Sequence, residues 1–340
     1  MFQCVLVCLC WFWCVYVYVY VYVCMCMCAF IPVLTFLHIL SCPSVCRAAS
    51  RIYEGLGVGV RVGKDGKGLF IENEIYRNTH AGVAVEEGGA PRFEGNAIYE
   101  GESDGVVCTA YGCGMFFKNK IHKNSLMGVV ITREANPTLI GNVVTKNKRC
   151  GVQIADRGRG LLEGNRISGN IEAGVRIESK ANPLIQKENR IHDGVAEGVL
   201  FTDNGGGIMR GNRVFGNTAA GVAIEESAPL VRKNFVYGGM SHGMHIRGGA
   251  TPRVERNDIF GNRCVKSKLE FAHCRSFHCH LLAGAHPSEP SYPHLRLHVR
   301  CRGPSFVGFG NRTTGCTQKQ WKQSTLKNQS SKPGGFSTHL

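Results

Sequence analysis

Apolar and polar positions alternate in short runs along most of this chain, and the runs recur with a fixed period. In residues 81–104 (AGVAVEEGGAPRFEGNAIYEGESD), Gly-Val-x-Val and Pro-x-Phe-x-x-Asn-x-Ile both alternate with period two. Alternation over about four to six residues, punctuated by Gly, Pro and Asn, predicts short β-strands joined by tight turns. The chain shows neither a helical period nor the Leu-x-x-Leu-x-Leu frame of leucine-rich repeats. We therefore expect neither of those repeat classes.

Three columns of residues set the period. An Asn recurs every 22 to 24 residues, a Gly-Val pair keeps the same step, and an Ile or Val stands two positions after each Asn. The Asn column consists of Asn73, Asn96, Asn119, Asn142, Asn165, Asn189, Asn212, Asn234 and Asn257. A fixed period of this length is typical of a solenoid, in which each repeat buries its apolar face against its neighbours.

The predicted fold is all-β, a single-stranded right-handed parallel β-helix over residues 51–264, with about nine turns of ~23 residues. Val83 and Val85, with their equivalents, should line one inner face, and Phe70, Phe93 and their equivalents a second. We interpret the Asn column as a structural ladder of side-chain hydrogen bonds. A second column, which holds only Asn and Gly and begins at Asn78, is expected to adopt positive φ.

Pairs of turns alternate between Pro and Gly at one corner, as at Pro91, Gly114, Pro137, Gly160 and Pro183. With segments such as RGRGLLEGN, ANPTLIGN and NRIHDG, this alternation resembles the β-helix region of the F-box only protein 11 family over residues 51–264. The resemblance implies a substrate-recognition module of an F-box type ubiquitin ligase. Its partner would be a protein to be ubiquitinated. It implies no catalysis and no cofactor, and a cytoplasmic or nuclear location.

The two ends of the chain differ from the repeats. Residues 1–46 include VYVYVYVYV and CMCMC, which the hexanucleotide GTGTAT encodes in two reading frames. We interpret this low-complexity segment as an artefact of the gene model. The alternative is a membrane anchor through residues 1–40, because these residues contain no Lys, Arg, Asp or Glu and an apolar run of this length can span a bilayer.

Residues 265–340 form a basic tail that we expect to be disordered, with 11 Lys and Arg against Glu270 and Glu289. The tail supplies most of the formal charge of +15, so this charge does not indicate specific nucleic-acid binding. Cys274, His278, Cys279 and His280 lack the spacing of a zinc site, and we predict no metal.

Few cysteines lie within the repeats. Cys108 occupies the Val85 core column and should behave as a small buried apolar residue. The spacing of the cysteines does not indicate a disulfide framework, which favours a reducing compartment.

Weak candidates for chemistry are Asp203, Glu225 and Glu226, at outward positions of adjacent turns. Two carboxylates about 5 Å apart could serve retaining glycosidase chemistry or bind calcium. Arg247, the nearest outward base, is placed one position and one turn away. We therefore expect solvated charges and binding rather than catalysis. The alternative function is a carbohydrate-active β-helix protein, either a polysaccharide lyase, hydrolase or epimerase, or a polysaccharide binder.

Overall fold

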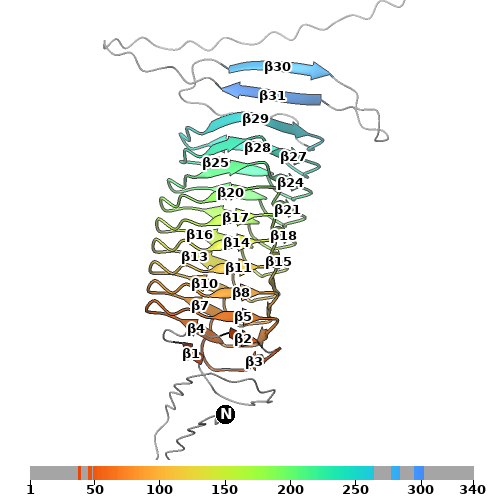
Figure 1. Ribbon diagram of the computed structural model, residues 1–340. Helices are drawn as coiled ribbons and strands as arrows, with labels where there is room; N and C mark the ends of the chain where they lie inside the picture. Colours follow the sequence, from red (N-terminus) through yellow and green to blue (C-terminus); the bar gives the residue numbers. More distant parts are fainter. Residues whose placement is uncertain (1–36, 40–44, 48, 264–276, 284–294, 302–340) are drawn as a thin grey trace, which may run out of the picture. The chain divides into compact units, whose positions relative to one another are not determined.

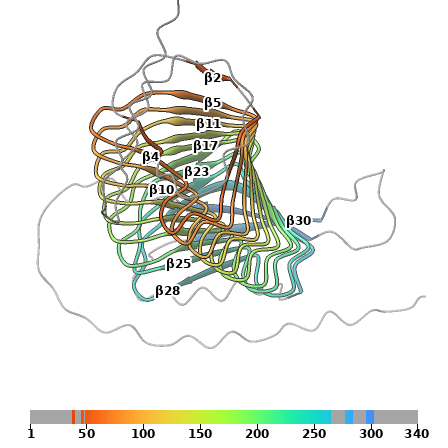
Figure 2. The same cartoon turned by 90° about the horizontal axis from the view of Figure 1, so that it is seen from below.

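The computed structural model describes residues 37–39, 45–47, 49–263, 277–283 and 295–301. Within these residues the chain forms only strands, turns and bends, and it winds as a parallel right-handed β-helix. The solenoid has about nine turns, about 23 residues apart, as predicted. Figure 2, seen along the stack, shows the turns lying over one another around a common interior.

Each turn contributes one short strand to each of three columns, named here sheets 1, 2 and 3. Sheet 1 consists of β1 (Leu37–Ile39), β4 (Val60–Val62), β7 (Val83–Val85), β10 (Val106–Cys108), β13 (Val129–Ile131), β16 (Val152–Ile154), β19 (Val175–Ile177), β22 (Val199–Phe201), β25 (Val222–Glu225) and β28 (Met244–Arg247). Sheet 2 consists of β2 (Val45–Arg47), β5 (Leu69–Ile71), β8 (Arg92–Glu94), β11 (Met115–Phe117), β14 (Thr138–Ile140), β17 (Leu161–Glu163), β20 (Leu184–Gln186), β23 (Ile208–Arg210) and β26 (Leu230–Arg232). Sheet 3 consists of β3 (Arg51–Tyr53), β6 (Glu74–Tyr76), β9 (Ala97–Tyr99), β12 (Lys120–His122), β15 (Val143–Thr145), β18 (Arg166–Ser168), β21 (Arg190–His192), β24 (Arg213–Phe215) and β27 (Phe235–Tyr237).

The last strand of the stack, β29 (Arg253–Phe260), continues both sheet 2 and sheet 3. Two further strands, β30 (Phe277–Ala283) and β31 (Leu295–Cys301), pair antiparallel with each other. Strand β31 also pairs antiparallel with β29. The edge that β29 would otherwise leave open is therefore hydrogen-bonded, which is one way in which natural proteins protect an edge strand.

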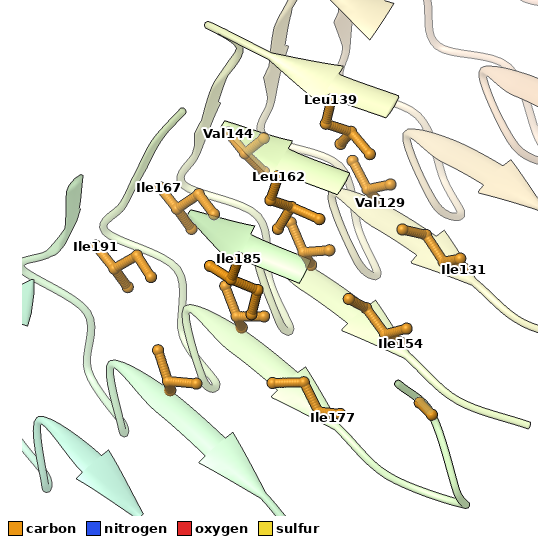
Figure 3. Close-up of a cluster of buried hydrophobic side chains, with 14 of the residues drawn as sticks. Val129, Ile131, Leu139, Val144, Ile154, Leu162, Ile167, Ile177, Ile185 and Ile191 are labelled. Carbon is orange, nitrogen blue, oxygen red and sulfur yellow. The ribbon is translucent and has the colours of Figure 1, made fainter. Parts of the chain in front are cut away.

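The core lies between the three sheets, and Figure 3 shows part of it. Val129 and Ile131 of sheet 1, Leu139 of sheet 2 and Val144 of sheet 3 converge there, and each is at most 1% exposed. Equivalent positions of the other turns are also buried, so the predicted inward columns are confirmed. Cys108 is one of them and is fully buried.

The Asn column lies inside the bend between sheets 2 and 3, and its side chains are at most 4% exposed. Asn142 shows the pattern. Its Nδ2 donates to Phe116 O at 2.8 Å and to Asn165 Oδ1 at 3.0 Å, while its Oδ1 accepts from the backbone N and Nδ2 of Asn119. Each amide thus satisfies buried backbone groups that the tight bend leaves without strand partners.

The second Asn and Gly column also forms a buried ladder, but its predicted positive φ is wrong. Positive φ falls one residue earlier, as at Lys123 (φ 58°) before Asn124 and Lys146 (φ 57°) before Asn147. The residue before the Asn points outward and takes the left-handed turn, at a cost of about 1 kcal/mol or more for a residue with a Cβ. The Asn itself keeps ordinary backbone geometry because its amide must align with the next turn: Asn124 Nδ2 donates to Asn147 Oδ1 at 3.1 Å.

The glycines of the Gly-Val pair are required for packing rather than for backbone angle. A Cβ on Gly151 would lie 2.6 Å from Gly174 O and 2.6 Å from Ile167 Cγ2. Both distances are far below van der Waals contact, so the period-wide Gly column follows from the close approach of successive turns.

Most of the two predicted end segments, 1–46 and 265–340, lies outside the described residues, including Cys274. The side chains of His278, Cys279 and His280 are also outside that set. In the described part of the chain, no helix is long and apolar enough to cross a membrane.

Candidate functional site

Asp203 and Glu226 lie on turns that follow sheet 1, and Glu225 is the last residue of β25 in that sheet. Asp203 accepts a hydrogen bond from Ser179 Oγ at 2.8 Å. Glu225 forms an ion pair with Arg247, which is its Cα partner on the next turn. Arg247 therefore lies one position and one turn away from Glu226, as predicted.

Glu226 follows Glu225 directly and occupies the position that Asp203 holds on the preceding turn. It is exposed, has a φ of 48°, and has no ion-pair partner among the described residues. Asp203 and Glu225 are thus already paired with other side chains, and the three carboxylates do not form an acid–base set. Within the described ranges, no group of three or more His, Cys, Asp or Glu could hold a metal ion.

The most organised part of the outer surface lies on sheet 3. The last residue of each sheet-3 strand points outward, and these residues form one column in register: Tyr53, Tyr76, Tyr99, His122, Thr145, Ser168, His192, Phe215, Tyr237 and Phe260. Tyr53, Tyr76, Tyr99 and His122 stack successively, with ring centroids 4.9, 5.0 and 5.1 Å apart. A second stack runs from His192 to Phe260, with centroids 4.6 to 5.1 Å apart.

Thr145 and Ser168 separate the two aromatic stacks, and we call His122, Thr145, Ser168 and His192 together the notch. The two imidazoles are three strand spacings apart, or about 14 Å. One face of His122 is covered by Tyr99 and one face of His192 by Phe215, at interplanar angles of 1° and 4°. Their other faces point toward the small hydroxyl side chains. The notch therefore has the partly exposed ring of His122 at one end, the buried ring of His192 at the other, and a hydroxyl-bearing floor.

The floor of the notch is fixed by short hydrogen bonds. Thr145 Oγ1 donates to Ser168 O at 2.7 Å and lies 3.3 Å from Ser168 Oγ. Because Thr145 uses its hydroxyl hydrogen in the first bond, Ser168 Oγ keeps hydrogen-bonding capacity for another group. The site thus offers a polar group to a ligand without leaving the backbone unsatisfied.

One imidazole of the notch is held in a defined tautomer. His192 is 6% exposed; its Nδ1 lies 2.7 Å from Asp193 Oδ2, and its Nε2 lies 3.2 Å from Arg166 Nε. Arg166 can only donate, so Nε2 accepts and Nδ1–H donates to the carboxylate. This arrangement fixes the ring plane and presents the guanidinium at the C-terminal end of the notch.

Cationic side chains surround the notch. Lys120, Arg166 and Arg190 project from the first positions of β12, β18 and β21, and Lys146 follows Thr145 directly. Lys120 and Lys146 have no ion-pair partner among the described residues, whereas Lys123 is paired with Glu100 at 3.2 Å. The local field is therefore positive.

His122 responds to this environment. Its pKa is lowered from the usual value, first by burial and then by the charges of Lys120 and Lys123, with a smaller effect of Lys146. Glu100 opposes the shift but does not reverse it. The imidazole is therefore neutral near pH 7, and an anion bound beside it would favour its protonation.

Sequence reasoning missed this face. The aromatic residues stand at a constant position, two residues after the first residue of each sheet-3 strand, but Thr145 and Ser168 interrupt the column. The signal was present in the spacing: Tyr76, Tyr99 and His122 follow the Asn column by three residues, as do His192, Phe215 and Tyr237.

Two family models match the chain. The right handed beta helix region matches residues 127–271, and the periplasmic copper-binding protein (NosD) family matches residues 54–187. Both findings support a general parallel β-helix protein. No curated protein matches the chain.

Several solved structures are similar to part of this chain. The A-module of mannuronan C-5 epimerase AlgE6 from Azotobacter vinelandii is 20% identical, with a TM-score of 0.43, over 60% of this chain and 64% of that chain. The periplasmic alginate epimerase AlgG is 16% identical, with a TM-score of 0.41, over 60% of this chain and 50% of that one. Pectate lyase Pel9A is 12% identical, with a TM-score of 0.36, over 70% and 73%. This chain spans less than two thirds of the length of the two epimerase structures.

These comparisons correct the predicted location and leave the predicted family resemblance without support. None supports the resemblance to the F-box only protein 11 family or a protein to be ubiquitinated as partner. The predicted cytoplasmic or nuclear location is wrong, because the family model that matches residues 54–187 is that of a periplasmic protein.

The family name also raises the question of copper. Copper sites in proteins are built from clustered imidazole and thiolate ligands, but Cys108 and Cys150 are buried singly in the interior. Burial, together with Glu172, raises the pKa of Cys150 to about 12. His242 and His245 stack on each other at 5.3 Å, with Ser241 Oγ 3.2 Å from His242 Nδ1. The described residues therefore do not fit a copper centre.

Proposed function

We propose that this protein is an exported polysaccharide-binding β-helix protein, and that it binds an anionic polysaccharide across the notch on sheet 3. The observation that supports this most directly is the break in the aromatic column at the place where unpaired lysines gather. A folding constraint alone gives no reason for small hydroxyl residues to replace two stacked rings in the middle of the column.

The His122 end of the notch suits the apolar face of a sugar ring. Continuous stacks expose only the edges of their rings to a ligand, because each face is covered by the next ring. At the notch, the face of His122 that Tyr99 does not cover is partly exposed, whereas His192 is buried. A sugar unit lying over Thr145 would contact this face of His122, and the neighbouring unit would hydrogen-bond to Ser168 Oγ.

The charges determine which polysaccharide would bind. Lys120 and Lys146 have no carboxylate partner in the described part of the chain, and Arg166 lies at the other end of the notch. An acidic polymer would supply the missing counter-charges, whereas a neutral polymer would leave them hydrated. The parallel solenoid adds a geometric advantage, since it presents equivalent positions at every strand spacing to a ligand that is itself a repeat.

The proposed role is binding rather than cleavage. The carboxylates Asp203 and Glu225 are paired with other side chains. Asp203 lies on the turn after sheet 1 and Glu225 at the end of β25, so neither is on sheet 3. Export is supported by the match to a family of periplasmic proteins.

Binding of the full chain to sodium alginate and polygalacturonate, measured by isothermal titration calorimetry, tests this function, with dextran as the neutral comparison. Replacing Lys120 and Lys146 together by Ala should weaken binding by about 1.4 kcal/mol, or about tenfold in Kd. The matched control replaces Lys64 and Lys180, two exposed lysines on the turn between sheets 1 and 2, and should leave Kd unchanged. Equal binding of dextran, or equal losses in the two double variants, would contradict the proposal.

A further inference from the structure

One turn of the solenoid is shorter than its neighbours. Six positions separate the last inward residue of sheet 1 from the following Pro at Val85–Pro91 and at Ile177–Pro183, but only five do so at Ile224–Pro229. The Asn column records the same deletion, since Asn212 and Asn234 are 22 residues apart. The missing residue falls at the corner after β25.

The shortened corner places a hydroxyl in a column of small apolar residues. Thr251 N donates to Ser227 O at 3.1 Å, just as Gly206 N donates to Ala181 O at 2.8 Å one repeat pair earlier. Ser227 therefore occupies the column of Ala181, which is 1% exposed. Ser227 itself is 3% exposed, and its Oγ has no hydrogen-bond partner within the described residues.

A hollow of about 350 Å³ lies beside this corner, and Asn204, Glu226, Ser227, Gly248, Gly249 and Thr251 are among the residues that line it. Its volume is at the lower end of the range for small-molecule sites, roughly 300–1,000 Å³. A bare metal ion would leave most of this space unfilled. A ligand of about monosaccharide size matches it better.

The lining defines the chemistry of that ligand. The Glu226 carboxylate can only accept hydrogen bonds, and Asn204 Oδ1, Ser227 Oγ and Thr251 Oγ1 can all accept as well. No Lys, Arg or His lines the hollow, and the neighbouring Arg247 is neutralised by Glu225. A primary ammonium group carries three donors and a positive charge, and it complements such a set.

We propose that this hollow is a second binding site, separate from the notch, for a small hydroxylated primary amine such as an amino sugar. The ammonium group would lie against the Glu226 carboxylate and Ser227 Oγ. The ligand's hydroxyl groups would reach Asn204 and Thr251. This site goes beyond the proposed polysaccharide binding and does not depend on it, because the notch is cationic and would repel the same ligand.

The test is calorimetric titration of the full chain with glucosamine, with glucose and N-acetylglucosamine as probes that lack the positive charge. Glucosamine should bind at least tenfold more tightly than either. Glu226→Gln should lower its affinity about tenfold, and Ser227→Ala severalfold. The matched control is Glu87→Gln, because Glu87 holds the same left-handed position on a turn of regular length.

Three results would overturn the proposal: equal affinity for glucosamine and glucose, equal effects of Glu226→Gln and Glu87→Gln, or displacement of glucosamine by calcium at stoichiometric concentration.

Insertion of one Gly after Ser227 restores the regular corner length and should abolish binding. Glu226→Gln keeps the test decisive if the insertion variant does not fold, since Glu226 is exposed. The Lys120 and Lys146 double variant should lose polysaccharide binding but keep glucosamine binding. A negative result at one site therefore does not contradict the proposal for the other.

Discussion

The buried Asn ladder and the outer aromatic column of sheet 3 follow the same period, yet only one of them is continuous. From Asn73 to Asn257 every repeat carries an Asn that bonds to the next, and none is replaced. On the outside, a stack of four rings is followed by two turns without a ring and then by a second stack. The inner ladder must be complete because each amide satisfies buried backbone groups of a neighbouring turn. The outer column does not satisfy buried backbone groups, so folding does not prevent Thr145 and Ser168 from interrupting it to form a ligand site.

The same contrast explains which departures from the period carry information. A lost Asn would leave several buried donors and acceptors unpaired, at about 1–3 kcal/mol each. A lost surface ring forfeits only about 0.5–1.5 kcal/mol of stacking beyond its buried area. Interruptions of a surface column therefore cost little folding free energy. They indicate positions where a requirement other than folding determines the residue.

The largest effect should come from a charge in the interior. Ile154→Asp places an unpaired carboxylate at a fully buried position of sheet 1, which costs several kcal/mol. Gln153, the neighbouring residue, is partly exposed, so Gln153→Asp should change the free energy of unfolding by less than about 1 kcal/mol. Urea denaturation measures both. Similar losses would mean that the inner and outer faces are assigned to the wrong residues.

The next effect separates the inner ladder from the outer column. Asn142→Ala removes two donated and two accepted hydrogen bonds from the buried bend, and should lower the free energy of unfolding by about 3 kcal/mol or more. Thr145→Ala, three residues later on the surface, removes one partly exposed bond to Ser168 and should cost about 1 kcal/mol. If Thr145→Ala were the more destabilising change, the hydroxyl floor of the notch would be a folding element after all.

Filling the notch with aromatic side chains should raise the stability of the fold but abolish polysaccharide binding. Thr145→Tyr with Ser168→Tyr would extend both stacks into one aromatic column and add about 1 kcal/mol of stability from ring stacking. The same change covers the free face of His122, so polysaccharide binding should be lost. Thermal unfolding and calorimetry on the same sample distinguish these effects. Retained binding in the filled variant would place the ligand elsewhere.

The smallest expected effect is a pH dependence of binding. The pKa of His122 is lowered in the free protein, so its imidazole is neutral at pH 7 and takes up a proton only in more acidic solution. An anionic ligand favours the imidazolium, and proton uptake on binding makes affinity rise as pH falls from 7 toward 5. Sugar carboxylates stay ionised over this interval if they titrate near pH 4, as Asp and Glu do.

The contribution of His122 to folding stability falls as pH falls, whereas the affinity for the ligand rises. A histidine with a lowered folded pKa contributes stability that is present above its unfolded pKa and is lost as pH falls through the folded value. Binding must therefore be measured where circular dichroism shows an intact fold. In His122→Gln the rise in affinity should disappear, and an unchanged pH profile in that variant would assign the effect to another group.

Short-range pattern in the sequence was sufficient for the fold. The step of 22 to 24 residues, with alternation inside each repeat, required a solenoid of strands, and Val129, Ile131 and Leu139 lie where that pattern places them. A period of two assigns each side chain to the inside or the outside, and burial of the apolar set then leaves a single register. The repeated Gly at the position of Gly151 was visible in the sequence. The reason for it, the close approach of Gly174 O, was visible only in the structure.

Tertiary structure alone decided what the surface can do. The stacks of Tyr99 on His122 and of His192 on Phe215 join residues on different turns of the chain, and the field at the notch comes from lysines on separate strands. The left-handed position before each Asn and the orphaned hydroxyl of Ser227 also follow from how one turn sits on the next. Periodicity specifies which residues repeat. Contacts between turns determine which of the exceptions meet, because a ligand site is made from neighbours in space that the period holds about 23 residues apart.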